Sequence, residues 1–183
     1  AIPRAILGYA AEKAAFDATS YLLDQGHTGI ALVTGQVRAD GVVERRLAGY
    51  RRALETRGVA YDPALVLSSS VTFDWGTAAA ERVIANPAIT AAFCTADLIA
   101  AGLIAGLHKL GRRVPEDVSV LGFDNLPIAS MVYPALTTVD QAILGKGRLA
   151  GEIVAAILDK RATTRETVMP TSIVVRDSVR RRG

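Results

Sequence analysis

This sequence contains one cysteine, few aromatic residues and no long apolar run, and each shortage excludes a class of protein. Cys94 cannot form an internal disulfide, and its place in an apolar run predicts a small buried side chain, as fits a reducing cytoplasm. No apolar run approaches the roughly 18 residues that a membrane-spanning helix needs, so we expect no membrane crossing. The first ten residues also lack the basic-then-apolar pattern of a secretory signal.

Signatures of catalytic and metal sites are missing as well. The sequence has no P-loop, no nucleophile elbow and no cluster of cysteine and histidine. Its two histidines, His27 and His108, have no partner at metal-ligand spacing, so we expect structural roles for both and neither a metal nor a cofactor. Carboxylates alone can exchange protons, but no third group completes a catalytic set, which argues against an enzyme.

The net charge of +3 is small, and the arginines are scattered apart from the run 180–182. A solvated surface explains this distribution better than a nucleic-acid interface. No pattern of a helix-turn-helix or a zinc finger occurs, so we do not expect these residues to bind DNA by themselves.

Hydrophobic residues make up 50% of the sequence, which is enough for a full core. Apolar runs alternate with segments of helical spacing, and glycine or proline separates them. The expected strands are 29–34, 64–67, 91–94, 118–121, 136–141 and 168–175, and the expected helices are 13–24, 43–57, 76–85, 98–110 and 144–158. This alternation predicts an α/β fold, a doubly wound parallel sheet with helices on both faces.

The stretch 91–125 is the most informative, because it is expected to form a strand, a helix and a second strand. Asp97 and Asp124 each lie just past the end of a strand. Strands joined by a crossover helix are parallel, and ligands bind beyond the carboxyl ends of such strands. The sequence therefore predicts a small-molecule site at this edge of the sheet.

Several longer motifs carry a family resemblance. They are, in order, QGHTGIALVTG, ERRLAGYRRALETRG, FCTADLIAAGLIAGLHKLGRRVPEDVSVLGFDN, YPALTTVDQ and TSIVVRDS. Together they resemble the effector-binding domain of the lactose/galactose-repressor (LacI/GalR) family of bacterial transcription regulators, over about residues 7–178. The resemblance implies the type I fold of periplasmic sugar-binding proteins, and RVPEDVSV favours a regulator over a transport protein.

The resemblance also implies a domain organisation. Residues 1–183 would be effector-binding domain, with the second, carboxyl-terminal lobe over 9–135 and 166–178. A helix over 142–160 would return to a first lobe that is mostly absent from the sequence, and would expose an apolar face. Operator DNA would be a partner only through an absent N-terminal region, and the whole protein would be a cytoplasmic homodimer. Segments near 9–12 and 137–141 would form the hinge.

Two residues match family positions that contact the effector. Arg46, in ERRLAGY, offers forked donors to vicinal hydroxyls or a carboxylate. The alternative is an ordinary surface arginine, as Arg45 and Arg51 are expected to be. Asp124 matches the acid of the Gly-aromatic-Asp motif and could accept hydrogen bonds from sugar hydroxyls or base N–H groups. The alternative is an acid that stabilises a turn or caps a helix.

The remaining candidates carry stronger alternatives. Asp97 matches the acid of a family Asn-Asp pair, although Ala96 precedes it here, and it could equally cap its helix. Asn125 is a weaker neighbour of Asp124. Phe73 and Trp75 could stack against a sugar or a planar base, or simply pack in the core. Many relatives carry Asp-Asn at positions 10–11, where this sequence has two alanines, which puts ordinary sugar specificity in doubt.

We therefore expect a ligand-sensing domain of a LacI-type regulator. Its effector would be a small polar metabolite, a sugar or sugar derivative first and a nucleoside or purine second. A substrate-binding protein of a sugar transporter is the alternative with the same fold, and a doubly wound enzyme is the third possibility.

Overall fold

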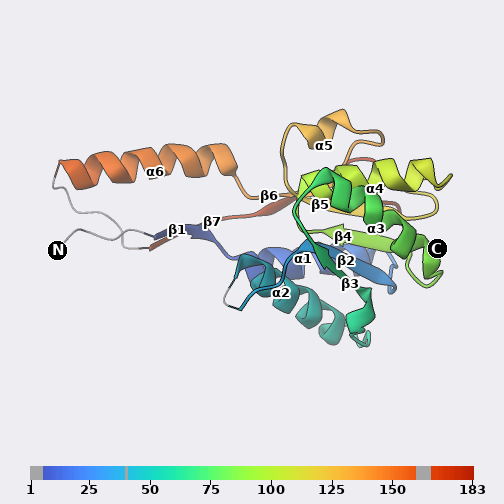
Figure 1. Ribbon diagram of the computed structural model, residues 1–183. Coiled ribbons are helices and arrows are strands. Elements are labelled where there is room, and N and C mark those ends of the chain that lie inside the picture. Colours follow the sequence, from blue (N-terminus) through green and yellow to red (C-terminus); the bar gives the residue numbers. More distant parts are fainter. Residues whose placement is uncertain (1–5, 40, 160–165) are drawn as a thin grey trace.

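Six strands form the central sheet of the protein, whose computed structural model describes residues 6–39, 41–159 and 166–183 (Figure 1). Five neighbouring strands run parallel, and the sixth lies antiparallel at one edge. In spatial order they are β3 (Val66–Ser69), β2 (Ile30–Gly35), β4 (Ala91–Cys94), β5 (Ser119–Asp124), β6 (Thr137–Asp140) and β8 (Ser172–Val174). The expected α/β sheet is confirmed, with this antiparallel edge strand as an addition.

Two pairs of helices cover the two faces of the sheet (Figure 1). Successive residues of β2 point to opposite faces: Ile30 and Leu32 pack with α1 and α2, whereas Ala31 and Val33 pack with α3 and α4. Strands buried on both faces are mostly apolar, as the short apolar runs of the sequence indicated. The helices are α1 (Ala11–Asp24), α2 (Val42–Thr56), η1 (Pro63–Leu65), α3 (Phe73–Ala85), α4 (Asp97–Lys109) and α5 (Ile128–Met131).

Glycines allow the paired helices to approach each other closely. A Cβ on Gly102 of α4 would collide with the carbonyl oxygen of Phe73, and one on Gly76 of α3 would collide with that of Ile99. In both cases the obstacle is backbone, which cannot rotate away as a side chain does. These contacts fix the start of α3 against α4.

We expect Gly102→Ala to lower the free energy of unfolding by roughly 2–3 kcal/mol, because the added methyl forces two backbones apart. Gly151→Ala is the matched control: it lies in a helix, and nothing stands within 4 Å of its added Cβ. That change should leave stability equal or raise it by up to about 1 kcal/mol. Urea unfolding followed by the fluorescence of Trp75 measures both, and equal stability of the two variants would contradict the packing described here.

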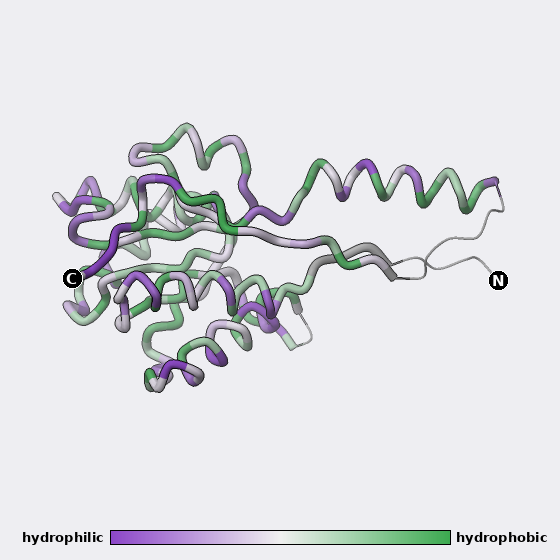
Figure 2. Tube along the Cα trace, turned by 180° about the vertical axis from the view of Figure 1, so that it is seen from behind, coloured by the Kyte–Doolittle hydropathy of each residue, from purple (hydrophilic) through white to green (hydrophobic). Residues whose placement is uncertain are grey.

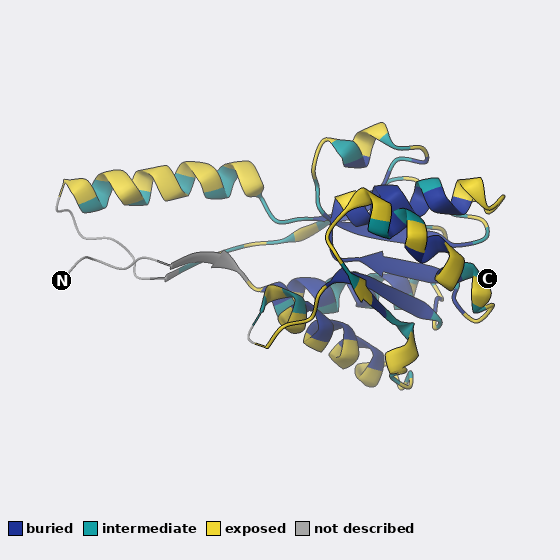
Figure 3. Ribbon diagram, viewed as in Figure 1, coloured by how far each residue is buried: buried dark blue, intermediate teal, exposed yellow. Residues whose placement is uncertain are grey.

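A second part of the structure extends away from this lobe. It consists of α6 (Ile143–Leu158) and of a two-stranded parallel ladder formed by β1 (Ile6–Tyr9) and β7 (Glu166–Met169) (Figure 1). None of the residues of α6 is buried, and Figure 3 shows only exposed and half-buried positions along it. Figure 2 shows hydrophobic bands along the same helix, and Leu144 is 90% exposed. The apolar surface expected for this helix is confirmed, although residue 160 of the expected range lies outside the described residues.

No helix in the described part of the chain combines the length and apolar character that crossing a membrane requires.

Two expectations about the elements were wrong. The single strand expected over 168–175 is two strands, β7 and β8, in different sheets. Pro170 lies between them, and proline cannot donate a hydrogen bond to a strand ladder. Helix α3 begins at Phe73 rather than at Gly76, because the Thr72 hydroxyl accepts a hydrogen bond from Trp75 N at 3.1 Å and caps the helix. Phe73 and Trp75 therefore lie in the first turn of α3, ahead of the helix start expected at Gly76.

Candidate functional site

The order of the strands marks where a ligand would bind. From β2 the chain moves outward to β3, then returns to β4 on the other side of β2 and continues to β5 and β6. Helix α2 follows β2 on one face, and α4 follows β4 on the other. A crevice opens at such a switch point, beyond the carboxyl ends of the strands. The predicted residues come from the segments that end at this edge.

Arg46 projects from α2 into this edge. Its side chain is buried, its guanidinium carbon lies 3.8 Å from the centre of the Phe123 ring, and Nη1 donates to the carbonyl oxygen of Thr95. Arg45 and Arg51, by contrast, are exposed. The alternative of an ordinary surface arginine is therefore wrong for Arg46, which contacts Phe123 of β5 and Thr95, the residue after β4.

Asp124 ends β5 and faces the same region. Its Oδ1 accepts a hydrogen bond from Gln141 Nε2 at 2.5 Å, and its backbone φ of 122° is rare outside glycine. Burial raises the pKa of Asp124 above its ordinary value, while the charges of Arg46 and Lys146 and the hydrogen bond from Gln141 oppose that rise. The charge of Arg46 therefore favours the ionised form of Asp124, which places both side chains in one region.

Asp97 has a different environment from the one expected. It is fully buried, its Oδ1 accepts from the Thr138 hydroxyl at 2.5 Å, and its Oδ2 accepts from Leu126 N at 2.7 Å. Burial raises the pKa of Asp97 to about 6. Its side chain does not cap its own helix, so that expectation was wrong. Asp97 instead braces the segment after β5 against β6.

Asn125 is also tied into the protein. Its Nδ2 donates to Asp140 Oδ2 at 3.3 Å, and its Oδ1 accepts from Arg176 Nη2 at 2.8 Å. A second guanidinium nitrogen of Arg176 donates to the carbonyl oxygen of Leu136 at 2.7 Å. This network connects β5, β6 and the segment that follows β8.

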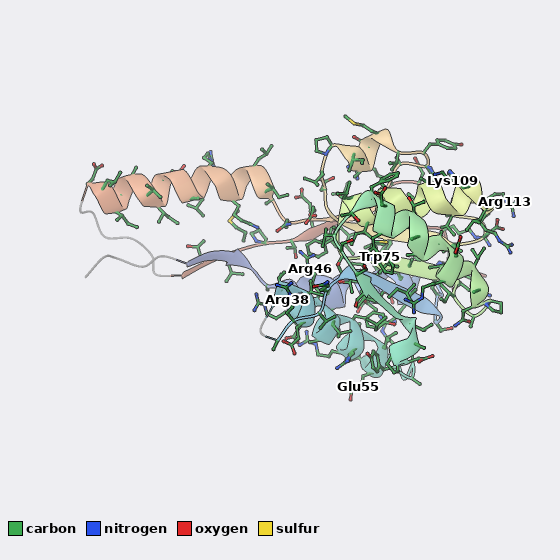
Figure 4. All side chains as sticks on the ribbon, in the orientation of Figure 1. Arg38, Arg46, Glu55, Trp75, Lys109 and Arg113 are labelled. Carbon is green, nitrogen blue, oxygen red and sulfur yellow. The ribbon has the colours of Figure 1, made fainter. Side chains whose placement is uncertain are left out.

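The two aromatic candidates differ in exposure. Trp75 is half-buried, and its Nε1 donates to the carbonyl oxygen of Thr34, near the end of β2, at 3.1 Å. Phe73 is exposed. Trp75 therefore lies at the carboxyl edge of the sheet, and Figure 4 shows it between Arg46 and the far end of the lobe, where Lys109 and Arg113 lie.

Sequence reasoning missed several polar groups at this edge. The hydroxyls of Thr34 and Thr95, both buried, are hydrogen-bonded to each other at 2.8 Å across β2 and β4. Gln141 and Lys146 were missed as well. The sequence did contain a signal for Gln141. This residue directly follows β6, and β6 lies parallel to β5, so the ends of the two strands, and with them Gln141 and Asp124, lie side by side.

The hollows described next lie elsewhere on the described part of the chain. A cavity of about 380 Å³ lies near the amino ends of the strands, lined in part by His27, Thr90, Arg112 and Arg180. A second hollow of about 580 Å³ lies beside Tyr61. Neither is lined by Arg46 or Asp124. Among the described residues no group of three or more His, Cys, Asp or Glu could hold a metal ion.

The relatives described below, found by comparison with known proteins, are transcription regulators. The family model for the periplasmic binding protein-like domain matches residues 19–179. The HTH-type transcriptional repressor PurR of Vibrio campbellii is 37% identical over 172 residues, which are 93% of this chain and 51% of that protein. Catabolite control protein A of Priestia megaterium is 33% identical, over 98% of this chain and 54% of its own. The chain spans about half the length of these curated relatives.

Solved structures have the same architecture. The transcription regulator CcpA of Lactococcus lactis superimposes with a TM-score of 0.88 at 29% identity, over 95% of this chain and 64% of that one. The transcriptional regulator CelR, solved as a cellobiose complex, gives a TM-score of 0.84 at 32% identity, over 97% of this chain and 54% of its own.

Proposed function

Because the chain belongs to the family of periplasmic binding protein-like domains, and its relatives are LacI-type transcription regulators, we propose that it is the ligand-sensing part of such a regulator. The ligand is a small polar metabolite that binds at the carboxyl edge of β2, β4 and β5. The observation that carries this proposal is the position of the buried Arg46 guanidinium against the ring of Phe123, the residue before Asp124, at the switch point of the sheet.

The proposed contacts follow from the hydrogen-bonding capacity of these groups. Asp124 accepts from ligand hydroxyls, and Arg46 donates to ligand oxygens, with each charge-assisted bond contributing about 1.5–3 kcal/mol. Trp75 offers the apolar face of its ring, and Phe73 lies at the rim. We assign Asp97 and Asn125 the role of holding the segment after β5 in place, since their side-chain oxygens are already bonded to the protein.

A sugar is the preferred ligand class, because a related regulator with the same fold binds cellobiose. A nucleoside or purine is the second class, because an acceptor beside an aromatic ring also suits a planar base. No chemical step is proposed, since the relatives are regulators and the site residues bind and orient without a nucleophile.

We propose that ligand binding changes the angle between two lobes. We propose that the lobe that holds the six-stranded sheet, which spans most of 9–135 and 166–178, is one wall of the cleft and that α6 and the β1–β7 ladder belong to the other. A ligand shifts such an arrangement only if its affinity for the two states differs. In the longer protein, a cytoplasmic homodimer, this shift alters the affinity of a separate DNA-binding region for its operator. The alternative with the same fold, a transporter's binding protein, is not favoured, because the relatives are transcription regulators.

The thermal unfolding midpoint, measured against sugars, sugar phosphates, nucleosides and purines, tests this function. A ligand at one hundred times its dissociation constant adds about 2.7 kcal/mol and raises the midpoint by several degrees. A rise with one chemical class identifies the effector. Absence of any rise, both for this chain and for a longer protein that includes a second lobe, would contradict a metabolite sensor.

A further inference from the structure

Several residues with unusual backbone dihedral angles lie at the junction between the lobe and α6. The non-glycine residues with positive φ in the described part of the chain are Asp124 at 122°, Asn125 at 55° and Ala142 at 51°. All three lie between the end of β5 and the start of α6. Such conformations persist only where surrounding contacts hold them, and they cluster at ligand-binding and switching segments.

Two chains of hydrogen bonds hold this junction. In the first, Asp140 Oδ1 accepts from Ala142 N at 2.7 Å, and Asp140 Oδ2 accepts from Asn125 at 3.3 Å. In the second, Lys146 Nζ donates to Gln141 Oε1 at 2.9 Å, and Gln141 Nε2 donates to Asp124 Oδ1 at 2.5 Å. The second chain connects α6 directly to the carboxylate assigned to the ligand.

Lys146 occupies an unexpected place on α6. The half-buried residues of that helix follow helical spacing along one side, and their other members are apolar or glycine: Gly145, Leu149, Ile153, Ala156 and Ile157. A lysine in such a stripe covers apolar surface with its stem and must find a polar partner for its ammonium group. Here that partner is Gln141, and through it Asp124.

We propose that Lys146 is a positioning residue for the ligand-binding site: through Gln141 it orients Asp124 and couples that carboxylate to α6. A ligand hydroxyl that donates to Asp124 Oδ1 competes with Gln141, so occupation of the site weakens the attachment of α6 to the lobe. This inference rests on the proposed function, because it explains how ligand binding at Asp124 would be transmitted to α6. The coupling itself exists without ligand and can be measured without one.

Charged groups from several elements surround Asp124. Arg46 approaches from α2 and Lys146 from α6, while Asp97 lies on α4. Asp140 is the register partner of Asp124 on β6, and Arg176 reaches Asn125 from the segment after β8. Lys146 is the member of this set that belongs to the extension, so replacing it changes the charge near Asp124 without removing a contact inside the lobe.

Titration by NMR of the Asp124 carboxyl carbon and the Gln141 side-chain amide tests the coupling in the whole chain. In the unaltered protein we expect both signals to change with the same midpoint. Lys146→Met should raise the pKa of Asp124, because its neighbouring ammonium favours the charged carboxylate, and Lys146→Arg should restore it. Lys109→Met is the control: it removes an exposed lysine at the far end of the lobe (Figure 4) and should change neither signal.

Hydrogen exchange tests the connection to the helix. The first-turn amide at position 146, which donates to the Ala142 carbonyl at 2.8 Å, should exchange roughly fivefold faster in Lys146→Met and in Asp124→Ala. Unchanged exchange in both variants, or an Asp124 midpoint that Lys146→Met leaves in place, would overturn the inference. Because neither measurement needs a ligand, such a result would leave the ligand panel to decide the proposed function separately.

Discussion

Asp124→Ala is expected to weaken ligand binding about 10-fold to 100-fold, because it removes an ionised acceptor whose hydrogen bonds to hydroxyls contribute about 1.5–3 kcal/mol. The cost in stability should stay near 1 kcal/mol, the lower end for a strained φ, because alanine is less tolerant of positive φ than aspartate. Titration calorimetry with the compound that raises the unfolding midpoint measures the affinity. Asp177→Ala removes an exposed carboxylate after β8 and is the control.

Asp124→Asn separates charge from backbone shape, because asparagine also accepts positive φ. An affinity within twofold of the unaltered protein in both Asp124 variants would exclude this carboxylate from the site. Arg46→Ala is a poorer test, since Arg46 is buried against the Phe123 ring and its loss removes packing as well as donors. Binding to an Arg46 variant therefore has meaning only after its folding has been verified.

The second large effect concerns stability. Asp97→Ala should lower the free energy of unfolding by about 3 kcal/mol, because it leaves two donors, Leu126 N and the Thr138 hydroxyl, without their buried acceptor. Asp97→Asn should cost less, since its amide oxygen can still accept one of these bonds. Urea unfolding of the three proteins measures the order, and equal stability of Asp97→Ala and the unaltered protein would show that the brace contributes nothing.

The same carboxyl group predicts a dependence on pH. Burial raises the pKa of Asp97 to about 6, above its ordinary value of 3.8, so the folded protein holds this proton more tightly than the unfolded chain. The part of the stability that comes from holding this proton is therefore fully present below pH 3.8 and is lost as the pH rises through about 6. The unaltered protein should gain stability relative to Asp97→Asn when the pH falls from 7 to 4. A difference that stays constant over this range would contradict the raised pKa.

Local patterns in the sequence were sufficient for much of the fold. Apolar runs bounded by glycine and proline identified the strands of the main sheet, and Cys94 is buried as its run predicted. The strand-helix-strand of 91–125 was also visible, since a helix as apolar as α4 has to be covered on most sides. Pro170 was a signal for the division of the last strand, but whether Val168 pairs with β1 or with β6 depends on contacts distant in the sequence.

The candidate site was predictable to a smaller extent. The position of Asp124 at the end of a buried strand placed it at the carboxyl edge from the sequence alone. The burial of Asp97 was not predictable, because its partner Thr138 lies 41 residues further along the chain. In the sequence, Lys146 is not distinguishable from the other charged residues of its helix. Only the fold shows that this helix begins beside Gln141 and Asp124.

The location of the ligand is the most direct test of the sensor proposed here. Backbone amide spectra of the isotopically labelled chain, recorded with the compound that raises its unfolding midpoint, show which residues respond. A site at the carboxyl edge requires the largest changes at Arg46, Trp75, Asp124 and Gln141. Changes that gather instead at His27, Thr90 and Arg112, around the cavity near the amino ends of the strands, would place the ligand in that cavity and contradict the assignment.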